Sequence, residues 1–211
     1  MIIDAVKILS VLQRDGFILR EISSPTLRMC LTAVEQNGMA LIHVPLSLQT
    51  REICLAAVRE AGCALQYVEN PTPEMCAIAV GNHGDALKYV PKKLQTPELC
   101  LRAVRKCGRA LRYLKVKQTP ELCMAAVIQD GSALRHVKRQ TAAICLAAVK
   151  QWGHALEFVK HQTPKICLAA VRHKSSAIRL VKKQTPLMIA IALYKDSYCV
   201  LQYIDKSTLE E

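Results

Sequence analysis

Residues 96–118 read TPELCLRAVRKCGRALRYLKVKQ, the clearest copy of a pattern that recurs along the chain. Each copy opens on a threonine, and consecutive threonines are 22 to 24 residues apart: Thr26, Thr50, Thr72, Thr96, Thr119, Thr141, Thr163 and Thr185. A fixed period of this length is typical of repeat proteins, in which each copy is one supersecondary unit. The pattern extends over essentially all 211 residues, so it predicts one array and no second domain.

Each copy is predicted to fold as two short helices. Thr96, Pro97 and Glu98 provide an N-cap, a first-turn proline and an acid at the positive end of the helix dipole. The apolar residues of 99–104 then fall on one face of an α-helix. Gly108 is predicted to end this helix in a left-handed conformation. Residues 110–114 are predicted to form a second helix of about two turns.

A helix of two turns is marginal in water by itself, so neighbouring copies are predicted to stack and shield their apolar faces. The predicted fold class is therefore all-α: an α-solenoid of about eight two-helix copies and a truncated last copy that starts at residue 208. Residues 1–25 are the N-terminal capping copy, residues 26–184 hold seven repeats, and residues 185–211 are the C-terminal capping copy.

The pattern of capped start, cysteine, Ala-Val pair and Gly-x-Ala-Leu resembles a short helical repeat of bacterial and giant-virus proteins. That family is described only as a domain of unknown function. The resemblance implies an all-α repeat array, and it brings no catalytic residue that can be transferred to this chain.

The amino-acid composition indicates the cellular compartment in which the protein is expected to function. The chain is 51% hydrophobic and only 4% aromatic, and its longest apolar stretch, residues 187–194, is far too short to span a membrane. The first residues lack the basic region of a signal peptide. Seven of the ten cysteines share one repeat position, which predicts buried free thiols rather than disulfides or zinc ligands. We therefore expect a reducing, cytoplasmic location.

The charge is concentrated in the second half of the chain. Residues 1–95 hold nine Lys/Arg and nine Asp/Glu, whereas residues 96–211 hold 20 and eight, which accounts for the formal net charge of +12. Equivalent positions of a solenoid line up along one side. Three such positions are predicted to form basic rows: Lys115, Lys138, Lys160 and Lys182 after the second helix, Arg112, Arg135 and Arg179 within it, and Arg105, Lys150 and Arg172 late in the first helix.

The sequence carries no recognisable catalytic chemistry. It has no Gly-rich phosphate loop, no HExxH and no GxSxG motif, so we expect no enzyme activity, cofactor, metal or small-molecule substrate. The basic rows are interpreted as a surface for a polyanion, although the solvated face of a repeat array also carries such charges without any partner. The first hypothesis is an interaction scaffold for an acidic protein, using residues 96–184 and Trp152 as a candidate anchor.

The alternative hypothesis is sequence-nonspecific binding of RNA or DNA through the same rows. Binding to single strands would require exposed aromatic rings on which bases stack. One repeat position does carry rings, namely Tyr67, Tyr89, Tyr113, His136 and Phe158. We expect these rings to be partly buried in the core, so the sequence leaves the choice between protein and nucleic acid open.

Overall fold

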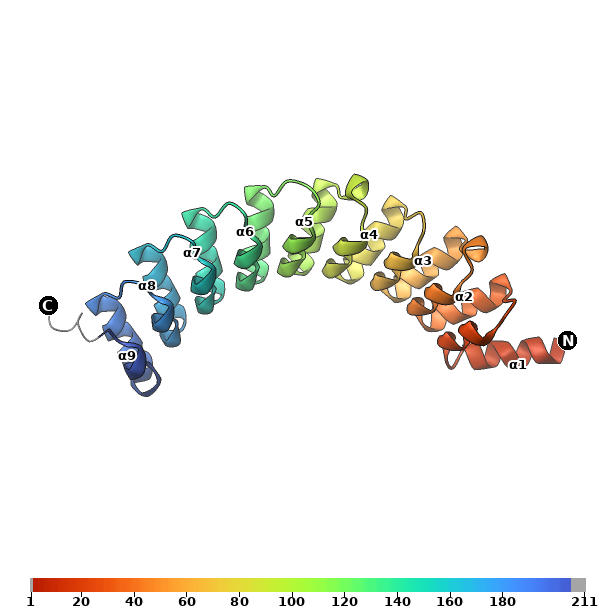
Figure 1. Ribbon diagram of the computed structural model, residues 1–211, viewed down its shortest axis with the longest axis horizontal. Coiled ribbons are helices and arrows are strands. Elements are labelled where there is room, and N and C mark those ends of the chain that lie inside the picture. The colour runs from red at the N-terminus through yellow and green to blue at the C-terminus, as the bar shows by residue number, and fades with distance from the viewer. Residues whose placement is uncertain (1, 206–211) are drawn as a thin grey trace. The chain divides into compact units, whose positions relative to one another are not determined.

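The computed structural model describes residues 2–205 as a succession of short helices, which confirms the all-α repeat fold (Figure 1). Each copy is an α-helix, labelled α, followed by a 3-10 helix, labelled η. The α-helices are α1 Ile2–Leu12, α2 Leu27–Gln36, α3 Arg51–Glu60, α4 Pro73–Asn82, α5 Pro97–Lys106, α6 Pro120–Gln129, α7 Ala142–Gln151, α8 Pro164–His173 and α9 Pro186–Val200. The truncated copy predicted at residue 208 lies outside the described residues.

The 3-10 helices lie between successive α-helices along the chain. They are η1 Gly16–Glu21, η2 Gly38–His43, η3 Leu46–Leu48, η4 Gly62–Tyr67, η5 Gly84–Tyr89, η6 Lys92–Leu94, η7 Gly108–Tyr113, η8 Gly131–His136, η9 Gly153–Phe158, η10 Ser175–Leu180 and η11 Leu201–Tyr203. Most of them have six residues, which is two turns of a 3-10 helix. The predicted second helix of each copy is therefore present, but it has the tighter 3-10 geometry.

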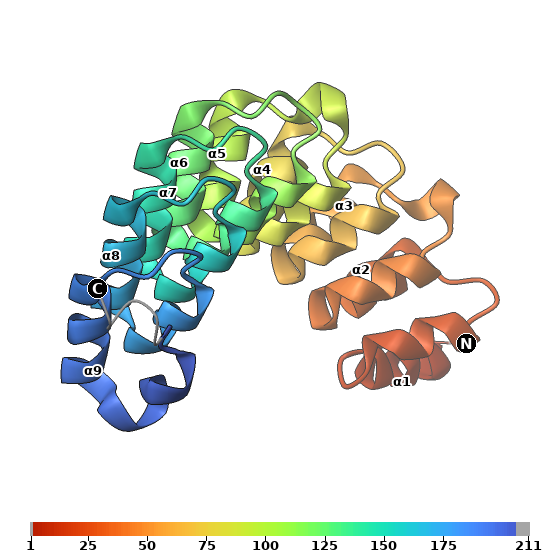
Figure 2. The same cartoon turned by 60° about the vertical axis from the view of Figure 1, so that its left-hand side comes forward.

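The copies group into two compact units. Unit 1 comprises residues 1–106 and 113–116, and unit 2 comprises residues 107–112 and 117–211. Within each unit, every α-helix packs on the α-helix of the next copy (Figures 1 and 2). The 3-10 helices η1, η2, η4 and η5 pack on one another in this order in unit 1, and η8, η9 and η10 do so in unit 2. Each unit is therefore built from an α layer and a 3-10 layer.

The predicted helix starts are confirmed. In every copy the side-chain oxygen of the repeat threonine accepts a hydrogen bond from the backbone N–H three residues later, at 3.2–3.4 Å. This hydrogen bond satisfies an amide that has no partner within the helix. Proline occupies the first helical position of α4, α5, α6, α8 and α9, where its missing N–H has no consequence.

The core repeats with the sequence. In the copy 119–140, Ala126, Val127 and Leu134 are completely buried, and Cys123 is 4% exposed. The α-helix contributes the first two and the cysteine, and the 3-10 helix contributes the leucine. The small alanine allows the 3-10 helix of the preceding copy to approach the α-helix backbone. Each copy thus supplies half of an interface that its neighbour completes.

The glycines have a different role from the one predicted. No glycine of the described chain has a positive φ, so the prediction of a left-handed helix end is wrong. Asp130 is extended (φ −147°, ψ 109°), and its N–H donates to the Ala126 carbonyl at 2.9 Å, which ends α6. Gly131 follows, and a Cβ on it would lie 2.6 Å from the Ala148 carbonyl oxygen of the next copy. Glycine is required here because the two backbones are in close contact.

Linker glutamines join neighbouring copies, a role that the sequence analysis did not predict. Gln140 Nε2 donates to the Phe158 carbonyl at 2.8 Å, and Gln140 Oε1 accepts from the Lys160 N–H at 3.0 Å. Gln118 and Gln162 make the same pair of hydrogen bonds with their own next copies. The available signal was the glutamine that directly precedes most repeat threonines.

Gln140→Leu is expected to lower the free energy of unfolding by about 1–2 kcal/mol, because it leaves a carbonyl and an N–H of the next copy without their partner. Gln49 is the matched control at the same repeat position. Its Oε1 is buried without a hydrogen-bond partner in the described chain, and its Nε2 makes a long hydrogen bond of 3.4 Å to the Val44 carbonyl, so Gln49→Leu is expected to cost much less than Gln140→Leu. Denaturant unfolding of both variants tests this, and equal losses would contradict the assigned role of the glutamines.

Candidate basic interaction surface

The first basic row of unit 2 lies on the linkers. Lys138, Lys160 and Lys182 are exposed, and the backbone N–H of each donates to the linker glutamine of the preceding copy at 3.0 Å. This recurring hydrogen bond places the three lysines at equivalent points of consecutive copies. Lys160 Nζ also donates to the Lys138 carbonyl at 3.2 Å, so the side chain extends toward the preceding linker.

Two of the predicted binding residues, Lys115 and Arg105, belong to unit 1. Both are exposed. Lys115 Nζ donates to the Val90 carbonyl at 2.8 Å and to the Lys88 carbonyl at 3.2 Å, which ties this lysine to the preceding linker. The contacts that fix the positions of Lys115 and Arg105 therefore lie within unit 1.

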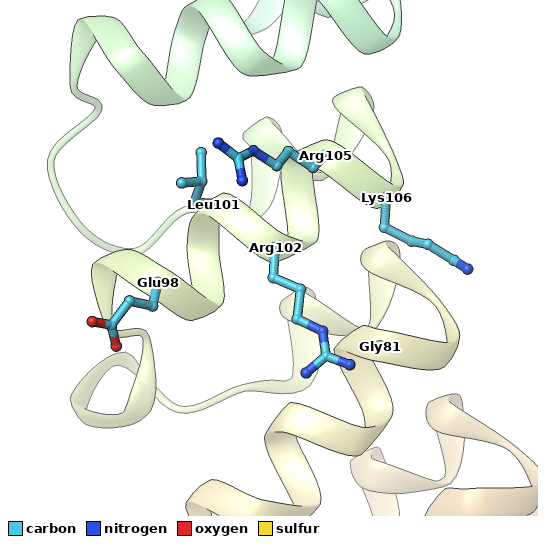
Figure 3. A pocket seen from close by; sticks show the side chains of 6 residues that line it. All are labelled: Gly81, Glu98, Leu101, Arg102, Arg105 and Lys106. Carbon is cyan, nitrogen blue, oxygen red and sulfur yellow. The ribbon is translucent and has the colours of Figure 1, made fainter.

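Arg105 lines a shallow pocket of about 520 Å³ on α4 and α5 (Figure 3). The Arg102 guanidinium lies against Gly81, where the missing side chain leaves room for it. The Glu98 carboxylate lines the same pocket and offsets part of the positive charge. The complete lining is Gly81, Glu98, Leu101, Arg102, Arg105 and Lys106.

The second row lies on the 3-10 layer. Arg112, Arg135 and Arg179 are exposed. The Arg135 guanidinium carbon lies 4.8 Å from the centroid of the Phe158 ring, a cation–π contact with the next copy. Arg135 therefore keeps its charge at the surface while its guanidinium covers an aromatic ring.

Trp152, the candidate anchor, is half-buried rather than exposed. Its ring centroid lies 6.2 Å from that of Phe158 and 5.8 Å from that of His154, both in the same copy. The indole thus belongs to a small ring cluster, and only part of its surface is open to a partner.

The aromatic repeat position is half-buried in all five copies, as predicted. Burial and the nearby Arg135 lower the pKa of His136 below its usual value. Burial and the nearby Arg179 lower the pKa of His154 in the same way. Both changes favour the neutral imidazole, so the histidines add little positive charge to this layer at neutral pH.

The third row lies on the α layer. Lys150 and Arg172 are exposed near the ends of α7 and α8, and they line one groove of about 440 Å³. Its floor is apolar, and Lys165, which the sequence analysis did not single out, lies at its edge. The complete lining is Leu146, Lys150, Lys165, Leu168, Ala169, Arg172 and His173.

The three rows do not share one face. In unit 2 they lie on the linkers, on the 3-10 layer and on the α layer, which corrects the expectation of rows along a single side. The reason is that the three repeat positions fall on three different parts of each copy.

The repeat cysteines are core residues. Cys30, Cys54, Cys76, Cys100, Cys123, Cys145 and Cys167 are at most 4% exposed. Burial raises the pKa of each thiol, in Cys76 to about 11. These thiols are therefore protonated and poorly nucleophilic at neutral pH. In the part of the chain that the structure describes, no three His, Cys, Asp or Glu side chains gather in a metal-binding arrangement.

Comparison with known families identifies the repeat. The family model described as Domain of unknown function (DUF4116) matches residues 26–70, 73–118 and 96–140, each match covering about two copies. Neither a curated protein nor a solved structure matches the chain. Among residues 2–205, no helix has both the length and the apolar character needed to cross a bilayer.

Proposed function

The chain belongs to the family described as Domain of unknown function (DUF4116), and because that description states no activity, we propose one from the chain's own residues. The protein is proposed to be a non-catalytic scaffold that binds an acidic protein through the basic surfaces of unit 2.

The observation that carries this proposal is the excess of exposed positive charge. Residues 117–184 hold 12 Lys/Arg against three acids, Glu121, Asp130 and Glu157. Asp130 already lies 3.5 Å from Arg109, so one of the three acids is in an ion pair. The linker edge adds a pocket of about 470 Å³ whose lining includes Lys117, Lys138 and Arg139 and no carboxylate. Such a surface attracts polyanions and accelerates their association.

The kind of side chain near the charges favours a protein over a nucleic acid. The rings at the aromatic repeat position are half-buried, so they offer no open platform for stacking bases. On the α layer the cations surround aliphatic side chains, Leu146 and Leu168. Aliphatic groups complement the apolar side chains of a protein partner, whereas sites for single-stranded nucleic acid combine cations with exposed rings.

Capture of partners from a lysate, with and without nuclease, tests this proposal. The variant Lys138→Glu, Lys160→Glu, Lys182→Glu reverses the linker row, and the variant Arg59→Glu, Lys92→Glu, Lys93→Glu makes the same change in charge on exposed residues of unit 1. The wild-type chain and the unit 1 variant are expected to retain the same acidic protein after nuclease treatment, released by salt, and the unit 2 variant to lose most of it.

Two results would overturn the proposal. One is that everything captured is nucleic acid and disappears after nuclease treatment, which would support the RNA or DNA alternative. The other is that both triple variants lose the partner equally, since binding would then follow net charge rather than the basic surfaces of unit 2.

A further inference from the structure

The groove on the α layer of unit 2 combines charge with an apolar floor. It runs over α7 and α8, which pack against each other. Leu146, Leu168 and Ala169 form the floor and are partly exposed, while Lys150 and Arg172 stand exposed at the rim. No carboxylate lines this groove, unlike the pocket on α4 and α5, where Glu98 is present (Figure 3).

Lys165 is the unusual residue of this groove. In α3, α4, α5 and α6 the second helical residue is an acid, namely Glu52, Glu74, Glu98 and Glu121, and it complements the positive end of the helix dipole. In α8 this position is Lys165, which is exposed and unfavourable next to that dipole, and in α2 of unit 1 it is Arg28. What distinguishes Lys165 is its location, because it adds a third cation to a groove that already has Lys150 and Arg172 and no carboxylate.

The next copy of the same chain, which begins with α9, extends this surface with apolar groups. Leu187 and Tyr194 occupy the repeat positions of Lys165 and Arg172, and they are 56% and 92% exposed. Because α8 packs on α9, these side chains belong to the α layer that contains the groove. A ligand for this surface therefore needs both negative charge and apolar side chains.

The His173 ring lines one end of the groove. Its Nδ1 accepts a hydrogen bond from the Gly153 N–H at 3.1 Å, which fixes the ring against the preceding copy. The rim thus offers three cations, Lys150, Lys165 and Arg172, beside the His173 ring.

We propose that this groove binds an acidic amphipathic segment of a partner protein. An aliphatic side chain of the segment lies on the floor formed by Leu146, Leu168 and Ala169, and its carboxylates face Lys150, Lys165 and Arg172. This inference rests on the proposed function and specifies the site and chemistry of the partner. The mode resembles the general binding of an amphipathic helix in a groove, with anchors spaced by about one helical turn.

A designed peptide tests the inference on the full chain. The probe is a fluorescent amphipathic helix of leucine and glutamate, and two control peptides carry serine for leucine or lysine for glutamate; fluorescence anisotropy measures the dissociation constants. The leucine–glutamate peptide is expected to bind, and each control peptide to bind at least about tenfold more weakly.

Lys165→Glu is the decisive variant, because it restores the acid that four other copies carry and should therefore fold; circular dichroism checks this. Lys165→Glu is expected to weaken binding of the leucine–glutamate peptide about tenfold. Lys165→Gln is expected to weaken it less, because only the glutamate repels the carboxylates of the peptide. Lys93→Glu, the same change in charge at an exposed lysine of unit 1, is expected to change the affinity less than about threefold.

The outcomes separate this inference from the proposed function. If Lys165→Glu leaves the affinity unchanged while the linker triple variant loses the captured protein, the groove assignment is wrong and the scaffold function stands. Failure of the leucine–glutamate peptide to bind, or tighter binding of an oligothymidylate of equal charge, also overturns the groove. Loss of the proposed function would instead appear in the lysate experiment.

Discussion

Gly131→Val is expected to destabilise unit 2 by about 3 kcal/mol. A Cβ on Gly131 would lie 2.6 Å from the Ala148 carbonyl oxygen and 2.9 Å from the Trp152 Cβ, and neither can move without opening the interface between two copies. The Gly131 N–H also donates to Gln151 Oε1 at 2.7 Å, and the displaced backbone would lose this hydrogen bond. Denaturant unfolding measures the loss.

Gly81→Ala is the control for this effect, and its expected sign is opposite. Gly81 lies inside α4, and its added methyl would meet only the end of the exposed Arg102 side chain, which is flexible and can move away. Alanine is favoured over glycine in a helix by about 0.5–1 kcal/mol, so the variant is expected to be slightly more stable. If Gly131→Val unfolds at the same denaturant concentration as the wild type, the close interface described for Gly131 is wrong.

The features that depend on neighbouring residues in the sequence were predictable. The period of 22 to 24 residues gave the repeat, and the Thr-Pro-Glu start gave the position of each first helix, because N-capping acts over three residues. The burial of Cys123, Ala126 and Val127 followed from their spacing on one helix face. The half-burial of the aromatic rings followed from their distance from the buried alanine of the same helix.

The features that depend on contacts between copies were not predictable in this way. The left-handed end predicted for Gly108 is wrong because a glycine after a helix is usually explained by its own φ, whereas here the cause lies in the Ala126 carbonyl of the next copy. The role of Gln140 was not predictable because its hydrogen-bond partners, the Phe158 carbonyl and the Lys160 N–H, are 18 and 20 residues away in the sequence. Lys165 became significant only when the groove placed it beside Lys150 and Arg172.

Deletion of residues 141–151 is expected to have the largest effect of all. It removes α7 and leaves η9 without the α-helix of its own copy, so buried residues such as Leu156 lose half of their surroundings. Unit 2 is expected to lose on the order of 5 kcal/mol, which is comparable to the whole stability of a domain.

Deletion of residues 141–162 is longer but keeps the repeat in phase. Gln140 then directly precedes Thr163, and it reaches the Leu180 carbonyl and the Lys182 N–H, the groups that Gln162 binds in the intact chain. His173, which accepts from the Gly153 N–H, takes the place of Gln151 opposite Gly131. The hydrogen bonds between neighbouring copies thus have equivalent replacements, whereas the cation–π contact of Arg135 is lost because Leu180 takes the place of Phe158.

Thermal unfolding of these two deletion variants, followed by far-ultraviolet circular dichroism, distinguishes two models. In one, each copy is stabilised by its neighbours; in the other, the chain folds only as a whole. The 22-residue removal should preserve the helical signal per residue and a cooperative transition, whereas the 11-residue removal should abolish the transition of unit 2. Collapse of both variants to the same unfolded spectrum would contradict nearest-neighbour support between copies, and with it the regular placement of the cations.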